Sequence, residues 1–395
     1  MKLRMRLLVS MAILLAASTL SAQEVRRVPA DVLARIVDDE PTLPRGFTAQ
    51  ERASWRLPDL SRVPFAPPTN LVHTSAEYEK NSGLLIRWGG QNAIHTDMTV
   101  AITTGDPDVL VHILVLGASQ QSSATATLTN AGANMSRVRF ITGVSDTVWI
   151  RDYGPRYVDE NGRRSMIDHV YNRPRPNDDA VPTLVAQTLS ETKYDIPLVH
   201  GGGNFHLFDD NTAYMTRLIA NENPALTDQQ IRDYYLAYQG LDVTLVDPLP
   251  ASFDSTQHID MWMLPADDGR VIINEYPSTG GIYTVPKQVS DATAALLAQR
   301  GKTVLRLGGW RATNPVDGGM AHFTYANAVI LNRLVLMCTF TGRDAENANA
   351  LSVFQQAFPA RQIVPINCSG IISLAGAIHC IVMHMPAILL RHGFE

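Results

Sequence analysis

From about residue 73 onward, apolar and polar positions alternate in short runs that come in pairs around turn residues, a pattern typical of β-hairpins. The clearest hairpin signal is Asn161-Gly162, which lies between two alternating runs in residues 156–170. Amphipathic stretches typical of helices follow, at residues 227–240, 290–301 and 347–358. Each of them leads into another strand-like run. The sequence therefore predicts a repeated unit of strand, turn, strand, helix and strand.

A polar residue opens or precedes each predicted unit. These residues are Asp152, Asn204, His258, Asn327 and Cys380, with gaps of 52, 54, 69 and 53 residues between them. A supersecondary unit that recurs at a nearly constant spacing forms either an open array or a closed ring. Because the units are few and their sequences diverge, we expect a closed, propeller-like ring of about five ββαβ units. In such a ring the five polar side chains meet near the axis.

The first 22 residues have the pattern of a secretory signal peptide. Lys2, Arg4 and Arg6 precede an apolar run, and Ala22 is a small residue suited to cleavage. No later apolar run is long enough to cross a membrane. We therefore expect an exported protein, periplasmic or secreted, with no membrane attachment after cleavage.

The remaining chain divides into two parts. Residues 23–72 are irregular and interrupted by prolines, which predicts an N-terminal extension with one helix near residues 48–55. Residues 73–395 then form the main domain. The net charge of −5 lacks the basic excess that phosphate backbones require, so we do not expect a nucleic-acid partner.

Three cysteines are present, namely Cys338, Cys368 and Cys380. An odd number in an exported protein leaves at least one thiol free or paired between chains. Three single-bridge pairings are possible, and the sequence does not choose among them. The unpaired thiol is a candidate for chemistry.

Asp152, His258, Asp260 and Cys380 together supply two carboxylates, an acid–base group and a thiol. His258 and Asp260 are two residues apart, which places them on one face if the segment is a strand. Two carboxylates and a thiolate suit a planar guanidinium, which carboxylates bind through paired hydrogen bonds and whose central carbon a thiolate can attack. A bound cation also favours the thiolate form of the cysteine. Trp149, nearby in sequence, could stack on that cation or belong to the core.

Three other interpretations use the same residues. A zinc site could be built from His258, Asp260, His379, Cys380 and His384, although the usual CxxC and HExxH spacings are missing. A Cys-His-Asn protease could use Cys380, His258 and Asn327, but both carboxylates would then have no role. A non-enzymatic binding protein would not need the complete set.

Four motifs carry a resemblance to a known family: WIRDYGP at 149–155, GGGN at 201–204, HID at 258–260 and IHC at 378–380. Together they resemble the guanidino-group-modifying pentein superfamily. Within it, the chain is most similar to the bacterial, Porphyromonas-type peptidylarginine deiminases and their agmatine deiminase relatives, from about residue 75 to the C-terminus. The resemblance implies a five-bladed α/β propeller of ββαβ units around a pseudo-fivefold axis, and residues 73–395 as its catalytic domain.

The resemblance also implies roles for individual residues. Cys380 is the nucleophile, His258 the general acid and base, Asp152 and Asp260 the guanidinium-binding carboxylates, and Asn327 an active-site amide. The expected reaction is attack on the guanidinium carbon, loss of ammonia, a covalent thiouronium intermediate and hydrolysis to a ureido product. Neither a metal nor an organic cofactor is expected.

Substrate choice depends on YNRPRPNDD at 171–179. In the bacterial peptidylarginine deiminases a matching Arg-Pro-Arg pair binds the α-carboxylate of a C-terminal arginine, which implies that role for Arg173 and Arg175. The sequence LAGAIHC at 374–380 departs from the GGGNIHC of agmatine deiminases, which also favours peptidyl-arginine. The expected partners are peptides or proteins with a C-terminal arginine. Agmatine and free arginine stay open as alternatives, as does the oligomeric state.

Overall fold

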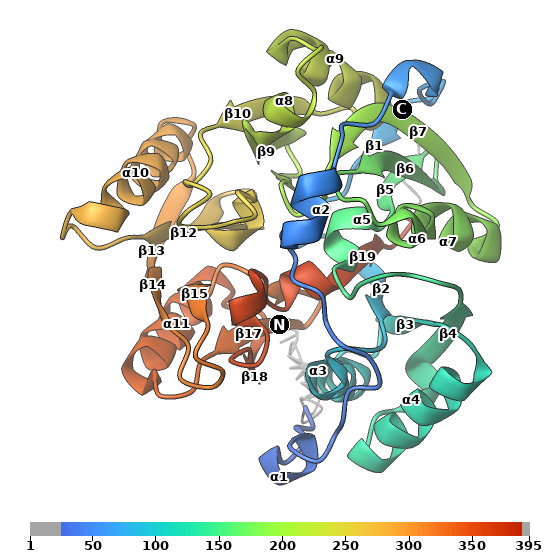
Figure 1. Ribbon diagram of the computed structural model, residues 1–395, viewed down its shortest axis with the longest axis vertical. Coiled ribbons are helices and arrows are strands. Elements are labelled where there is room, and N and C mark those ends of the chain that lie inside the picture. The colour runs from blue at the N-terminus through green and yellow to red at the C-terminus, as the bar shows by residue number, and fades with distance from the viewer. Residues whose placement is uncertain (1–24, 389–395) are drawn as a thin grey trace, which may run out of the picture.

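The computed structural model describes residues 25–388. The strands of this part form small, separate sheets, which Figure 1 shows arranged around the middle of the molecule. The predicted signal peptide at residues 1–22 lies outside the described residues. Within them, no helix combines the length and the apolar character needed to cross a bilayer.

Five of the sheets repeat one pairing pattern. In each, an antiparallel pair of strands is followed, through a helical crossover, by a strand parallel to the second member of the pair. The five are β19 (Val382–Pro386), β2 (Asn81–Arg87), β3 (Leu110–Val115) and β4 (Val138–Thr142); β5 (Arg156–Glu160), β6 (Arg163–Tyr171) and β7 (Thr192–His200), with β1 (Val72–His73) at the edge; β8 (His206–Leu207), β9 (Thr212–Thr216) and β10 (Asp242–Val246); β11 (Met263–Asp267), β12 (Arg270–Glu275) and β13 (Thr303–Gly308); and β16 (Val329–Ile330), β17 (Leu334–Thr339) and β18 (Gln362–Asn367). The predicted unit of hairpin, helix and strand is thus confirmed in four of these sheets, whereas in the fifth the antiparallel pair joins β19 from the end of the chain to β2.

The crossovers carry most of the α-helices of the described residues. These are α3 (Asn92–Gly105), α4 (Ala118–Ala131), α6 (Pro176–Asp179), α7 (Val181–Leu189), α8 (Leu218–Glu222), α9 (Asp228–Gln239), α10 (Thr284–Gln299) and α11 (Asp344–Ala357). A separate hairpin of β14 (Trp310–Thr313) and β15 (Met320–Phe323) lies between two of the sheets in the chain. Among the described residues no strand pairing joins neighbouring sheets, so the strands do not form one closed sheet.

Local sequence explains where these elements begin and turn. At the predicted hairpin, Asn161 and Gly162 both have positive φ, 52° and 76°, which this residue pair adopts readily. The N-terminus of α9 carries a capping box, in which the Thr227 side chain accepts from the backbone of Gln230 and the Gln230 side chain accepts in return. Gly240 ends the helix in the left-handed conformation that favours glycine.

The C-terminal strand β19 pairs antiparallel with β2, near the start of the main domain, with Val382 opposite Ile86. Both strands are buried almost throughout, because apolar side chains cover them on both faces. The short helix η6 (His379–Ile381) directly precedes β19. This pairing therefore fixes the C-terminal motif with Cys380 in the interior of the molecule.

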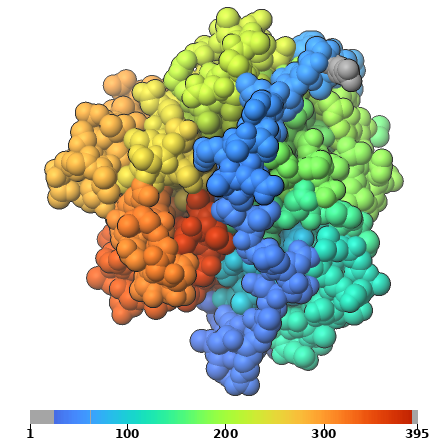
Figure 2. Space-filling view, viewed as in Figure 1, coloured from blue at the N-terminus to red at the C-terminus, as the bar shows by residue number. Residues whose placement is uncertain are grey.

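Residues 25–72 form an irregular arm that lies across one face of the molecule, shown in blue in Figures 1 and 2. The arm contains the short helices α1 (Ala30–Leu33) and α2 (Ala49–Ser54). The predicted helix near residues 48–55 is therefore confirmed, and its cause is again a capping box, between Thr48 and Glu51.

A disulfide joins Cys338 to Cys368 and leaves Cys380 as a buried free thiol. Cys338 lies on β17, and Cys368 directly follows β18, its parallel neighbour, so the sheet holds their Cα atoms 5.4 Å apart. We expect reduction to lower the free energy of unfolding by about 3 kcal/mol, because the bridge closes a loop of 30 residues in the unfolded chain. Urea unfolding with and without a thiol reductant measures this change.

The control is the Cys338→Ala/Cys368→Ala double variant, which lacks the bridge. Its unfolding should not respond to the reductant. Identical unfolding curves of the wild-type chain in oxidising and reducing buffer would contradict the expected contribution of the disulfide.

Candidate active site

Four of the predicted site residues meet in the middle of the molecule. Asp152 lies on the short helix α5 (Ile150–Tyr153), and Cys380 lies in η6. His258 directly precedes the 3-10 helix η3 (Ile259–Met261), which contains Asp260. All four are at most 1% exposed. The expectation that His258 and Asp260 share one face of a strand was wrong, because the tight turn of η3 places them instead.

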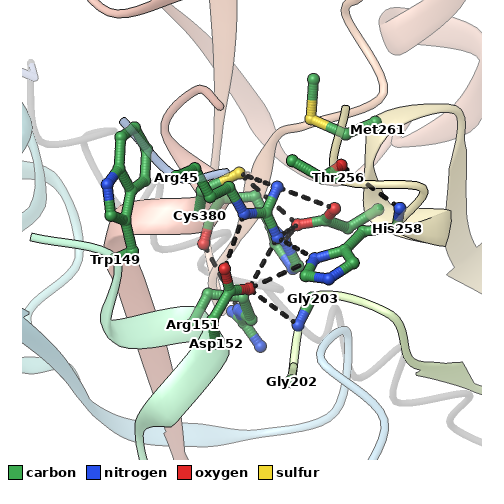
Figure 3. Close-up of polar contacts among 12 residues, drawn as sticks. Arg45, Trp149, Arg151, Asp152, Gly202, Gly203, Thr256, His258, Met261 and Cys380 are labelled. Atoms are coloured by element: carbon green, nitrogen blue, oxygen red, sulfur yellow. Dashed lines mark hydrogen bonds and ion pairs between the residues drawn. The ribbon is translucent and has the colours of Figure 1, made fainter. Parts of the chain in front are cut away.

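The centre of this site holds a residue that the sequence analysis missed, Arg45 of the N-terminal arm (Figure 3). Its Nε and Nη2 donate to the two carboxylate oxygens of Asp152, at 2.8 and 2.7 Å. Its Nη1 and Nη2 donate to the two oxygens of Asp260, at 3.2 and 3.1 Å. Both carboxylates therefore bind one guanidinium in the paired geometry that this cation favours.

The thiol and the imidazole also touch this guanidinium. Cys380 Sγ lies 2.6 Å from Arg45 Nη1, and His258 Nδ1 lies 2.7 Å from Nη2. Because arginine can only donate, Nδ1 of His258 accepts this hydrogen bond. The Nε2 of His258 is buried and has no hydrogen-bond partner in the described part of the chain. The four predicted residues thus enclose a guanidinium, the group that their chemistry indicated.

The charges around this cation shift the pKa of each ionisable neighbour. Burial alone would raise the pKa of Asp152 and Asp260, but the Arg45 guanidinium holds both below their ordinary value. Burial raises the pKa of the Cys380 thiol well above its ordinary value, and the nearby guanidinium only partly offsets this effect. Both aspartates are therefore ionised, and the thiol needs a proton acceptor to become a nucleophile.

Asn327 connects the segments that carry the thiol and Asp260. Its Oδ1 accepts from the backbone N–H of His379 at 3.1 Å and lies 3.3 Å from Cys380 Sγ. Its Nδ2 donates to the backbone carbonyl of Asp260 at 3.2 Å. The amide thus connects the segments that carry the thiol and one carboxylate. Asn327 lies in the site, as the resemblance implied.

The glycine run at residues 201–203 allows the backbone to approach the site closely. The N–H of Gly203 donates to Asp152 at 3.1 Å. A Cβ atom at Gly203 would overlap Arg45 Nη2, so this position has no room for a side chain. The next residue, Asn204, hydrogen-bonds the backbone of Thr216 and does not contact the guanidinium. The expectation that all five polar residues meet was therefore wrong for Asn204, which binds a neighbouring strand instead.

Arg173 and Arg175 lie against the arm. Arg173 Nε is 3.4 Å from the backbone carbonyl oxygen of Arg45, and its guanidinium stacks over the Phe47 ring at 4.2 Å. Arg175 donates to the carbonyl oxygens of Pro44 and Gly46, at 2.9 and 3.2 Å. The dyad thus surrounds the backbone of the residue whose side chain fills the site.

Trp149 is fully buried, and its Nε1 donates to the carbonyl oxygen of Leu43 at 2.8 Å. Among the cation–π contacts of the described residues, no pair involves Trp149, so of the two alternatives left open by the sequence the structure shows the buried indole and not the stacking. The indole instead binds the backbone two residues before Arg45.

A second set of polar residues lies behind Asp260. His379 joins Asp260 to Glu77, with Nδ1 and Nε2 each 3.0 Å from a carboxylate oxygen. Glu77, His206 and His379 are close enough to share a metal ion, but Arg151 already places a cation 2.7 Å from Glu77. Among the described residues, the zinc set considered from the sequence does not form such a group, and the Arg45 guanidinium contacts three of its members, His258, Asp260 and Cys380. His379 was missed as a positioning residue, although the IHC motif contains it.

Comparison with known proteins places this geometry in a family. A family model described as Porphyromonas-type peptidyl-arginine deiminase matches residues 73–386. A Photobacterium profundum protein named "Putative agmatine deiminase" is 23% identical over 366 residues, which cover 82% of this chain and 98% of that protein. A Streptomyces avermitilis protein of the same name is 25% identical, over 61% of this chain and 75% of that one.

Solved structures share the fold. The agmatine deiminase of Enterococcus faecalis superposes with a TM-score of 0.71 at 19% identity, covering 80% of this chain and 96% of that one. A structure described as the "Putative Arginine Deiminase from Porphyromonas gingivalis" superposes with a TM-score of 0.68 at 18% identity. The match covers 80% of this chain and 98% of that one. At these identities the likeness concerns the fold.

Proposed function

The chain belongs to the Porphyromonas-type peptidyl-arginine deiminase family, whose relatives are deiminases of guanidino groups, and on this premise we propose that it converts peptidyl-arginine to citrulline. The observation that carries the proposal is the environment of Arg45, an arginine within a polypeptide. Its guanidinium touches both carboxylates, the thiol and the histidine. We also infer that the five sheets are the five blades of the pentein propeller.

In the proposed reaction, Arg45 marks the position of the substrate guanidinium. The Cys380 thiol gives its proton to His258, and Sγ forms a bond to the guanidinium carbon. His258 protonates the nitrogen at the Nη2 position, which it faces, and the C–N bond breaks to release ammonia. Water, deprotonated by His258, then attacks the thiouronium carbon, the C–S bond breaks, and the ureido product leaves. Asp152 and Asp260 hold the cation throughout, and no step uses a cofactor.

The position of Arg173 supports a C-terminal arginine as the preferred substrate. Its Nε faces the carbonyl oxygen of the residue in the site, at 3.4 Å. In a C-terminal arginine, that oxygen belongs to the α-carboxylate, which a buried guanidinium binds more strongly than a neutral carbonyl. The expected substrates are therefore peptides or proteins that end in arginine.

We expect Arg173→Ala to raise KM about tenfold or more for a peptide with a free C-terminal arginine, since a charge-assisted hydrogen bond contributes roughly 1.5–3 kcal/mol. The KM for the C-terminal amide should change much less. Ammonia release from both peptides measures the difference, and Arg163→Ala, at an exposed position of β6, is the matched control. Equal effects on the two peptides would contradict recognition of the carboxylate.

The names of the relatives favour agmatine as a second candidate substrate. Agmatine has a guanidinium but no carboxylate, so it would use the same four residues without Arg173. If agmatine is the natural substrate, its turnover should be unaffected by Arg173→Ala, and arginine peptides should react poorly.

The proposal includes action outside the cytoplasm. It is supported by the signal-like pattern of residues 1–22 and by the Cys338–Cys368 disulfide, since such bonds persist mainly in oxidising compartments.

A further inference from the structure

The arm is fixed to the main domain on both sides of Arg45. Before it, Arg27 pairs with Asp97 of α3 at 2.8 Å. After it, Glu51 of α2 pairs with Arg175 at 2.8 Å. The arm therefore crosses the site as a segment anchored at both ends, which Figure 2 shows as a continuous blue band over the centre of this face.

The backbone around Arg45 is bound as a peptide ligand would be. The N–H of Arg45 donates to the carbonyl oxygen of Leu374 at 2.9 Å. Trp149 and Arg175 bind the carbonyl groups on either side, as described above. A Cβ atom at Gly376 would lie 3.2 Å from the Arg45 side chain and closer still to Trp149. The path of the Arg45 side chain into the site thus depends on a glycine at 376.

A substrate guanidinium cannot enter while Arg45 is bound. Both carboxylates, the thiol and His258 Nδ1 are already in contact with Arg45. The side chains of Arg45, His258 and Cys380 have no exposed surface, so solvent water is kept from the reacting atoms. Hydrolysis of a thiouronium needs that water, so Arg45 cannot be converted to citrulline while the arm closes the site.

We propose that residues 42–51 are an intramolecular pseudosubstrate that blocks the active site, so that the chain is latent until this segment is displaced. This inference rests on the proposed function, because it takes the Arg45 position as the substrate position. Since the segment is tethered, its effective concentration reaches the millimolar range, and a free peptide must compete with it. Displacement of Arg45 opens the thiol, the carboxylates and the histidine together.

The test compares the full chain with Arg45→Ala in two assays. The first is the rate at which iodoacetamide alkylates Cys380, located by peptide mass spectrometry. The second is ammonia release from a peptide with a free C-terminal arginine. We expect both rates to rise about a hundredfold, because an intramolecular competitor of this effective concentration is removed. The matched control is Arg56→Ala, an exposed arginine of the same arm that hydrogen-bonds only nearby backbone, and it should change neither rate.

Glu51→Ala is a second variant that tests the proposal if Arg45→Ala does not fold. It removes the anchor of α2 on Arg175 and leaves the residues around the guanidinium unchanged, so it should raise both rates to a smaller extent. Unchanged alkylation and ammonia release in both variants would overturn the proposal. Citrulline at position 45 of the purified wild-type chain would overturn it too, because Arg45 would then be a substrate.

The two assays also separate this inference from the proposed function. Alkylation of Cys380 reports access to the site and does not require catalysis. Faster alkylation of Arg45→Ala with no ammonia from any guanidino substrate would support the blocking segment and contradict the deiminase.

Discussion

Replacement of Cys380 with alanine should abolish ammonia release, with a loss of at least about a thousandfold in kcat, because no other described thiol is free to form the covalent intermediate. The measurement is ammonia production from a peptide ending in arginine. It is made in the full chain and in the Arg45→Ala background, so that occupation of the site by the arm does not hide the loss.

The fold should survive this change, because alanine fits the space of the buried thiol. Circular dichroism and the urea midpoint check this. The matched control is the Cys338→Ala/Cys368→Ala double variant, which removes the other two sulfur atoms and should keep most of the activity while losing stability. Ammonia release by Cys380→Ala within tenfold of its parent would contradict the role of this thiol as nucleophile.

Asp152→Asn should lower kcat/KM for arginine peptides by about a hundredfold or more, since loss of one partner of a buried, hydrogen-bonded charge pair costs roughly 2–5 kcal/mol. Asp152 accepts two hydrogen bonds from the guanidinium and is 1% exposed. An asparagine of the same shape keeps one acceptor and places a donor against the cation.

Steady-state kinetics in the Arg45→Ala background measures this loss. Asp233→Asn, at an exposed position of α9, is the matched control and should leave kcat/KM unchanged. The Asp152→Asn/Arg45→Ala double variant should also bind the arginine peptide more weakly. A change of less than threefold in kcat/KM would show that the substrate cation is not held at Asp152.

The repeated unit could be predicted from the sequence because its signals are local. The Asn161-Gly162 turn and the cap of α9 each depend on residues close together in the chain. The site residues of the main domain were found because two carboxylates, a histidine and a cysteine together suit the binding and attack of a guanidinium. The strand expected around His258 was wrong, since a period of two in three residues does not distinguish a strand from the tight turn that the structure contains.

Arg45 could not have been found in this way. It lies in an irregular segment, 107 residues before Asp152 and 335 before Cys380, and no periodic pattern surrounds it. Its role depends on how the arm crosses the finished fold. The choice of Cys338–Cys368 among three pairings likewise depends on β17 and β18 being parallel neighbours, which sequence spacing does not specify.

The decisive measurement is the release of ammonia and ureido product from four substrates, by the full chain and by Arg45→Ala. The substrates are a peptide ending in free-acid arginine, its C-terminal amide, free arginine and agmatine. We expect Arg45→Ala to turn over the free-acid peptide faster than the full chain does, and to turn over the amide and agmatine more slowly than that peptide. Turnover of agmatine alone would contradict peptidyl-arginine as the substrate, and absence of turnover on all four by both proteins would contradict the deiminase itself.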